Sequence, residues 1–432
     1  MDITAPRGTN DIMPYEVRKW QYLEEQIRSI CRRYDYKEIR TPIFEETVLF
    51  QRGIGDITDI VEKEMYTFID RAERSMTLRP EGTAPVVRSY LEHKMYGGPQ
   101  PIKLYYMGPM FRYERPQAGR YRQFHQFGAE VIGACVPEVD AEVIDLAMHL
   151  YYSLGLDELE LQINSIGCPL CRGKYREVLR AALAGHRESL CSNCARRYER
   201  NPLRMLDCKE KRCKEIMTDI PSIHEYLCDE CADHFQRLQG YLNALSISYV
   251  INPKLVRGFD YYAKTVFEVI YRGLGAQDAI GGGGRYDGLI ETYGGPSTPA
   301  VGFAAGIERI LLTLERLGKE LPFQSQLDVY MIILNEAGKK LGLPLLKDIR
   351  GRGFKADIDY MGRSLKSQMK AANRRGARFV VIIGEDELSK GKAIIRNMKV
   401  GTEEEVPFDE VVERFIEIRL ETDQGVLMCR RR

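Results

Sequence analysis

The sequence has little that would place it in a membrane or in an oxidising compartment. No apolar run approaches the roughly 18 residues that cross a bilayer, and residues 1–7 lack the apolar core of a secretory signal. The longest strongly apolar stretches, at residues 329–334 and 379–383, have the length of β-strands. We therefore expect a cytoplasmic protein that does not associate with membranes.

The chain also lacks a large net charge, since it has 63 basic and 62 acidic residues among 432. A polycation is thereby excluded, so any nucleic-acid interface must come from local patches. Residues 168–214 hold 13 basic and five acidic side chains, and residues 328–400 hold 16 and eight. Both segments are candidate RNA-binding surfaces. For the second, the solvated faces of ordinary helices explain the charge as well as RNA binding does.

Several motifs of nucleotide-binding and hydrolytic enzymes are missing. The sequence has no G-x-x-x-x-G-K-[ST] segment, which excludes a P-loop, and it has no nucleophile elbow and no H-E-x-x-H helix. A nucleotide, if bound, must be held by other means.

Cysteines, in contrast, are concentrated in one window. Eight of the 11 fall within a span of 64 residues: Cys168, Cys171, Cys191, Cys194, Cys208, Cys213, Cys228 and Cys231. Cytosolic thiols stay reduced, so disulfides are a poor interpretation, whereas C-x-x-C pairs at long spacing are typical of structural zinc. Eight ligands would suffice for two closed sites, or for one site with spare thiols. Thiols that hold no metal are the alternative.

Hydrophobic periodicity predicts a mixed N-terminal part. Apolar residues recur at helical spacing in residues 14–34 and 138–154, and residues 102–113 and 121–133 predict a long antiparallel hairpin around the loop 114–120. Further strands are expected at residues 265–271 and 279–286, and a strand followed by a helix at 301–314.

The pattern changes after an expected linker at residues 318–327. Short strands at 329–334, 355–360 and 379–383 alternate with helical segments at 336–350 and 364–375. This alternation predicts a small α/β domain with mainly parallel strands.

Arginines embedded in expected strands and turns are the main chemical signal, and aromatic residues flank several of them. Such arginines suit the recognition of phosphate and stacking on a base. They are Arg112, Arg115, Arg120, Arg122, Arg257, Arg285 and Arg309. Two acids, Glu81 and Glu130, stand in apolar or glycine-bounded settings, where an unpaired carboxylate is costly. Each therefore meets a cation or donor, which is either a structural partner or a substrate amine.

Five segments together resemble the histidyl-tRNA synthetase family: residues 6–11 (PRGTND), 79–83 (RPEGT), 107–126, 255–262 (LVRGFDYY) and 281–309. The resemblance implies an α+β fold with the antiparallel catalytic sheet and flanking helices of a class II synthetase over residues 1–325. It also implies an insertion domain at 168–245, an anticodon-binding α/β domain at 328–432, and a homodimer joined through a motif around residues 39–47.

The resemblance further implies ATP-dependent activation of L-histidine and its transfer to the 3′ end of tRNA(His), with release of AMP and pyrophosphate. ATP would enter with Mg²⁺. Arg112 and Arg257 correspond to the catalytic arginines at the α-phosphate, and Phe124, Gln126 and Arg309 complete the expected ATP site. The expected histidine site consists of Glu81, Gly82, Thr83, Gln126, Glu130, Arg257, Tyr261 and Tyr262.

For tRNA, the resemblance places the acceptor end at Arg115, Gln117 and Arg120. Two other functions are alternatives. A regulatory paralogue of histidine biosynthesis would lack the anticodon domain and lose active-site arginines, both of which are present here. A non-catalytic zinc-containing RNA-binding module would account for the cysteines but would give Glu81, Glu130 and Arg257 no purpose.

Overall fold

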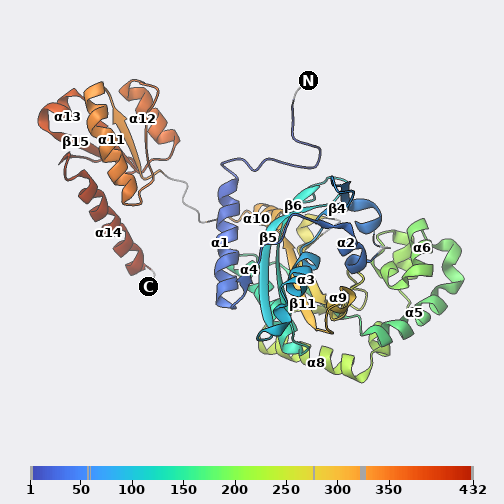
Figure 1. Ribbon diagram of the computed structural model, residues 1–432. Helices are drawn as coiled ribbons and strands as arrows, with labels where there is room; N and C mark the ends of the chain where they lie inside the picture. The colour runs from blue at the N-terminus through green and yellow to red at the C-terminus, as the bar shows by residue number, and fades with distance from the viewer. Residues whose placement is uncertain (1–2, 56–57, 59, 276–277, 322–326, 430–432) are drawn as a thin grey trace. The chain divides into compact units, whose positions relative to one another are not determined.

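The computed structural model describes residues 3–429 except 56–57, 59, 276–277 and 322–326. The chain divides into two compact units, Met1–Leu321 and Pro322–Arg432 (Figure 1). Five residues of the expected linker, 322–326, lie outside the described part. Among the described residues, no helix has both the length and the apolar character that a membrane crossing requires.

The N-terminal unit is built on an eight-stranded sheet with the order β1-β5-β6-β11-β10-β9-β7-β8. Only the β1–β5 and β7–β8 pairs are parallel. The strands are β1 (Lys37–Glu38), β5 (Ile102–Phe111), β6 (Gln123–Ile132), β7 (Glu160–Ser165), β8 (Val250–Ile251), β9 (Ala263–Ile270), β10 (Ala279–Arg285) and β11 (Ala300–Gly306). A small antiparallel sheet has the order β2-β4-β3 and comprises β2 (Phe44–Glu46), β3 (Tyr66–Ile69) and β4 (Ser75–Leu78).

The long antiparallel hairpin expected from the sequence is confirmed. Strands β5 and β6 pair over their whole length, from Ile102 opposite Ile132 to Phe111 opposite Gln123. The loop at 114–120 connects them and is closed by mutual backbone hydrogen bonds between Gln117 and Arg120.

Alternation along the strands gives the sheet two different faces. On β6, Phe127, Ala129 and Val131 pack into the main core. That core also contains buried residues of helices α1 (Val17–Arg33), α4 (Pro137–Ser153) and α10 (Ile307–Arg316). Figure 1 shows these three helices grouped together. Because the side-chain period of a strand is two, Gln126, Gly128 and Glu130 face the other way.

Helices α2 (Thr47–Ile54), α3 (Thr83–Glu92) and α9 (Leu289–Thr292) pack around the second face. The short helical turns are η1 (Ile60–Glu64), η2 (Met95–Gly97), η3 (Ala184–Ser189), η4 (Pro202–Asp207), η5 (Ile223–Tyr226) and η6 (Arg272–Leu274).

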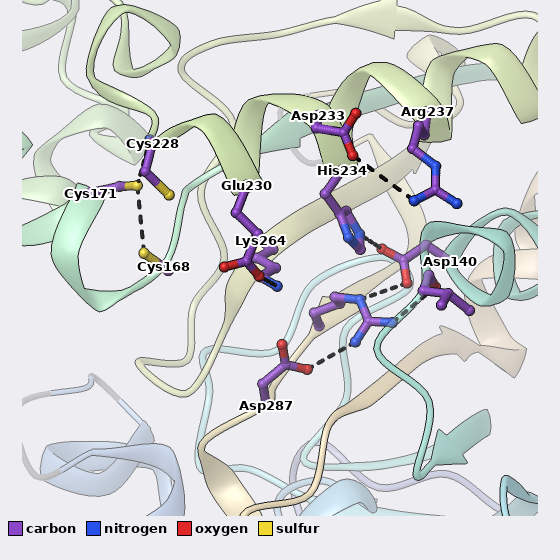
Figure 2. Close-up of polar contacts among 12 residues, drawn as sticks. Asp140, Cys168, Cys171, Cys228, Glu230, Asp233, His234, Arg237, Lys264 and Asp287 are labelled. Atoms are coloured by element: carbon purple, nitrogen blue, oxygen red, sulfur yellow. Dashed lines mark hydrogen bonds and ion pairs between the residues drawn. The ribbon is translucent and has the colours of Figure 1, made fainter.

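The cysteine-rich segment between β7 and β8 is helical, with α5 (Pro169–Leu183), α6 (Ser192–Arg200), α7 (Lys211–Ile216) and α8 (Asp229–Ala244). Figure 1 shows α8 along one end of the sheet, with α5 and α6 projecting beyond it. Polar contacts fix helix α8 to its neighbours: His234 hydrogen-bonds to the buried Asp140 of α4 at 2.8 Å, and Glu230 pairs with Lys264 of β9 at 2.7 Å (Figure 2).

Arg285, one of the strand arginines, belongs to this anchor rather than to a phosphate site. Its side chain is fully buried, and its guanidinium pairs with Asp140 at 2.7 Å and with Asp287 at 2.9 Å. It also donates to the carbonyl oxygen of Ala134 at 2.9 Å. Since these partners occupy the guanidinium on several sides, its role is structural.

The C-terminal unit has a five-stranded sheet with the order β13-β12-β14-β15-β16. Its strands are β12 (Val329–Ile333), β13 (Ala356–Ile358), β14 (Phe379–Ile383), β15 (Lys392–Asn397) and β16 (Glu403–Pro407), and its helices are α11 (Glu336–Gly351), α12 (Leu365–Arg374), α13 (Glu385–Lys390) and α14 (Val411–Cys429). The three expected strands are parallel. Strands β15 and β16 add an antiparallel edge that the sequence did not predict.

Candidate active site

The second face of the catalytic sheet carries a chain of buried carboxyl and hydroxyl groups. Glu130 lies on β6 and is 1% exposed. One of its carboxyl oxygens accepts a hydrogen bond from the Thr83 hydroxyl at 2.8 Å, and the other accepts one from the Tyr286 hydroxyl at 2.7 Å. A Cβ atom on the neighbouring Gly302 would come within 1.7 Å of the Glu130 carboxyl group, so only glycine leaves room for it.

Glu81 stands at the start of α3. Its carboxyl oxygens accept backbone hydrogen bonds from Thr83 at 2.7 Å and from Ala84 at 2.8 Å. A carboxylate at a helix N-terminus satisfies amide groups that have no partner within the helix and is favoured by the helix dipole. The motif at 79–83 therefore positions Glu81 and Thr83 together, next to Glu130.

Burial shifts the titration of these acids. It raises the pKa of Glu130 from 4.5 to about 8, although the hydrogen bonds from Tyr286 and Thr83 oppose the shift. Burial also raises the pKa of Glu81, against the opposing hydrogen bonds from Ala84 and Thr83. Buried acids with such shifts are typical of functional sites.

Arg257 supplies a positive charge on the same face. It forms an ion pair with Glu268 of β9, and its guanidinium crosses Gly282 of β10, where a Cβ atom would come within 2.8 Å of it. Its Nε is buried and has no hydrogen-bond partner within the described residues. Burial raises the pKa of the Tyr262 hydroxyl, and the Arg257 guanidinium opposes that shift.

The aromatic part of the site is continuous. The rings of Tyr261 and Tyr262 lie 4.7 Å apart, and Tyr261 meets Tyr286 edge to face at 5.8 Å. The Arg112 guanidinium lies over Phe124 at 5.2 Å and donates from Nε to the Pro80 carbonyl oxygen at 2.9 Å. The structure thus connects the predicted nucleotide pair, Arg112 and Phe124, to the 79–83 motif.

The other predicted residues lie on strand β6, on helix α10 and in the loop at 114–120. Gln126 projects from the same side of β6, and its Oε1 is buried without a partner in the described part of the chain. Arg309 lies on α10 and donates from Nε to the Ala279 carbonyl oxygen at 2.6 Å. In the loop, Arg115 and Gln117 are exposed, and Arg120 pairs with Glu114 at 2.6 Å.

Sequence reasoning missed three residues of this face. Tyr286 holds Glu130, and Glu268 pairs with Arg257. Tyr106 is buried in a space left by Gly82 and Gly128, whose Cβ atoms would lie 2.2 and 2.3 Å from its ring. Tyr106 and Glu268 follow the two-residue alternation of their strands, so that period was the signal that could have found them.

The eight cysteines of the insertion form two separate groups. Cys168, Cys171, Cys228 and Cys231 make one, and Cys191, Cys194, Cys208 and Cys213 the other. Within each group the sulfur atoms lie within 4.8 Å of one another.

Comparisons with known proteins identify the family of both units. Residues 8–310 match the histidyl-tRNA synthetase family, and residues 328–418 match an anticodon binding domain. The histidine–tRNA ligases of Desulforamulus reducens and Pelotomaculum thermopropionicum are each 56% identical over 95% of this chain, covering 98% and 96% of their own lengths. The crystal structure of apo S. aureus histidyl-tRNA synthetase is 45% identical and superimposes with a TM-score of 0.83 over 96% of this chain and all of its own.

The mainly antiparallel sheet and the C-terminal α/β unit are those of a class II aminoacyl-tRNA synthetase. With matches across both units, the chain belongs to the histidyl-tRNA synthetase family. It activates histidine with ATP and charges tRNA with it. The expected fold class is confirmed.

Replacing Glu130 with glutamine should flatten the pH dependence of stability. Because the pKa of Glu130 rises from 4.5 to about 8 on folding, the folded protein retains a proton that the unfolded chain releases. The resulting stabilisation is full below the lower pKa and is lost as the pH rises through the higher one. Urea unfolding of both proteins between about pH 5 and pH 8 measures this.

The wild-type free energy of unfolding should fall more steeply over that range than that of the Glu130→Gln variant. Glu92→Gln, at an exposed position on α3, is the matched control and should keep the wild-type slope. Parallel curves for wild type and Glu130→Gln would contradict the assignment.

Proposed function

We propose that the polar face of the sheet is where histidine and ATP react. The observation that carries this proposal is the buried chain Glu81–Thr83–Glu130, in which Thr83 donates hydrogen bonds to both acids. The Arg257 guanidinium lies on the same face of the sheet, against Gly282. Carboxyl groups and a guanidinium can bind the ammonium and the carboxylate of an amino acid.

Histidine offers an ammonium group, a carboxylate and an imidazole ring with two nitrogen atoms. Glu81 and Thr83 are proposed to receive the ammonium group, with Gln126 as a further ligand. Glu130, Tyr261 and Tyr262 would surround the ring, where a carboxyl oxygen accepts from a ring N–H. A cationic group in the pocket would also lower the raised pKa of Glu130.

This pocket would give selectivity without editing. An amino acid that lacks the ring N–H would leave the buried Glu130 without its partner, and such polar sites reject analogues by about 10⁴–10⁵-fold. The hydrogen bonds from Thr83 and Tyr286 hold the carboxyl group in place before substrate binds.

The activation step needs positive charge rather than a base. The histidine carboxylate is already ionised, and its oxygen attacks the α-phosphorus as the bond to pyrophosphate breaks. Arg112 and Arg257 are proposed to bind the α-phosphate, and Arg309 the terminal phosphates, with Phe124 stacked on the adenine. Mg²⁺ enters with ATP as part of that substrate. The histidyl group then passes to the 3′ end of the tRNA and AMP leaves.

Zinc has no step in this reaction. Every candidate zinc ligand is a thiol, and an ion with four protein sulfur ligands keeps no open position for a substrate.

Arg257→Ala should slow adenylate formation by about 10²–10³-fold, which is typical for loss of one preorganised transition-state partner. Histidine affinity should fall less, because the guanidinium charge matters most as charge develops on the phosphate. Pyrophosphate–ATP exchange measures the first quantity and equilibrium dialysis of histidine the second.

Arg272→Ala, at an exposed arginine paired with Glu160, is the control and should leave exchange unchanged. Wild-type exchange should require histidine among the twenty amino acids. Equal losses of rate and affinity in Arg257→Ala would remove the proposed role.

The C-terminal unit is proposed to bind the anticodon stem-loop, and the 114–120 loop, with Arg115, Gln117 and Arg120, the acceptor end. Deleting residues 328–432 should reduce tRNA charging by at least about tenfold while histidine-dependent exchange persists, since the catalytic unit is compact by itself. Charging and exchange assays on the truncated chain test this. Undiminished charging would refute the anticodon role.

A homodimer is proposed through the small sheet. Large apolar side chains are exposed on and beside it: Ile43, Phe44, Val48, Phe68 and Ile69. An apolar patch of this kind marks an association surface. Sedimentation of the wild-type protein should give the mass of two chains. The Phe44→Glu/Phe68→Glu double variant should give the mass of one chain. A monomeric wild-type protein at micromolar concentration would exclude the dimer.

A further inference from the structure

The two cysteine groups have the geometry of metal sites rather than of disulfides. In the first group, the Cys168 and Cys171 sulfurs are 3.6 Å apart, and in the second the Cys191 and Cys208 sulfurs are 3.9 Å apart. A disulfide bond measures about 2.05 Å. In a tetrahedron with zinc–sulfur bonds of about 2.3 Å, neighbouring sulfurs lie about 3.8 Å apart.

The backbone around the sulfurs is arranged to support thiolates. The Cys228 amide donates to the Cys171 sulfur at 3.1 Å, and the Cys194 amide donates to the Cys191 sulfur at 3.4 Å. Gly167, which precedes the first C-x-x-C pair, has φ +67° and a Cβ there would come within 2.5 Å of the Cys171 Cβ. A turn this tight admits glycine far more readily than other residues.

The sites are nested along the chain. The first group joins the start of α5 to the start of α8, and Figure 2 shows Cys228 at the beginning of that helix beside Cys168 and Cys171. The second group lies wholly within the loop that the first one closes. Each group thus ties a different part of the insertion.

A polar side chain near each cysteine group hydrogen-bonds to the segment that carries Arg257, Tyr261 and Tyr262. Arg172, adjacent to Cys171, donates to the carbonyl oxygen of Tyr262 at 2.8 Å. Asn201, between Cys194 and Cys208, donates to the Asp260 carboxyl group at 2.9 Å. The insertion therefore contacts this segment at the Tyr262 carbonyl oxygen and at the Asp260 carboxyl group.

We propose that the insertion binds two structural zinc ions, one at Cys168, Cys171, Cys228 and Cys231 and one at Cys191, Cys194, Cys208 and Cys213, and that Arg172 and Asn201 transmit this rigidity to the histidine pocket. The thiols release their protons on binding, and neither ion touches a substrate. Arg172 and Asn201 are positioning residues. The metal assignment is independent of the proposed function, whereas the role of these two residues rests on it.

Zinc content tests the metal sites without any assay of activity. The full chain, purified without chelator and analysed by inductively coupled plasma mass spectrometry, should carry about two zinc ions, as two four-thiolate sites require. Cys168→Ser/Cys171→Ser and Cys208→Ser/Cys213→Ser should each lose one, and Cys135→Ser, at an exposed cysteine outside both groups, should lose none. Three results would overturn the assignment. The wild-type protein could contain no zinc, it could contain iron instead, or the wild type and both double variants could all contain one ion.

Thiol alkylation of the wild-type protein gives the same answer should a variant fail to fold. All eight cysteines should be protected until a chelator is added, while Cys135 reacts in both conditions. Reaction of the partly exposed Cys168, Cys191 and Cys228 before chelation would overturn the proposal.

Arg172→Ala tests the connection to the pocket. It should raise the KM for histidine by about tenfold, typical of one lost hydrogen bond from a charged group. The KM for ATP and the zinc content should stay unchanged. Arg172→Lys should restore part of the effect, and Asn201→Ala should give a smaller change in the same direction.

Lys174→Ala, at an exposed position on the same helix, is the matched control. An unchanged KM for histidine in Arg172→Ala, or equal increases in both KM values, would remove the positioning role. Either result would leave the zinc count standing, and exchange that requires histidine would still support the active site itself.

Discussion

Two anions must meet in this active site, and that constraint governs much of the catalytic unit. The histidine carboxylate and the triphosphate of ATP repel each other, and water screens that repulsion poorly once a site is closed. Fixed guanidinium groups offset it and cost no reorganisation during the reaction. The fold must therefore hold arginines at set positions on a partly buried surface.

The antiparallel sheet meets that demand through its two-residue alternation. One face fills the core with Phe127, Ala129 and Val131, which leaves the opposite face for Gln126 and Glu130. Glycines on the neighbouring strands β10 and β11 clear the space for the long polar side chains that cross them. Glu268 and the Pro80 carbonyl oxygen then orient Arg257 and Arg112. Strand alternation thus places Gln126 and Glu130, and contacts with the sheet and with the 79–83 motif orient the arginines.

The sequence was informative where the signal is local. The hairpin of β5 and β6, helix α1 and the alternation of the C-terminal unit all follow from periodicity, and the structure confirms them. The polar strand β16, rich in glutamate, carries no such pattern, so the antiparallel edge was missed. Arg285 is one of the seven arginines whose setting suits phosphate recognition, and its structural partner Asp140 is too distant in sequence for local patterns to indicate.

The cysteines also show what a local sequence pattern can and cannot predict. Their spacing indicates metal binding, but the number of sites depends on which pairs the fold brings together. The structure joins the first pair to the last and encloses the other four. Arg172 and Asn201 hydrogen-bond to the backbone or to an acid of the segment that carries Tyr261 and Tyr262, and such residues have no sequence signature.

A crystal structure with histidine and a non-hydrolysable ATP analogue tests the central claim most directly. The account predicts the guanidinium groups of Arg112 and Arg257 at the α-phosphate, within hydrogen-bond distance on either side of the histidine carboxylate, and Arg309 at the terminal phosphates. Side chains of these arginines directed away from the phosphates, with the carboxylate unopposed by any of them, would contradict it.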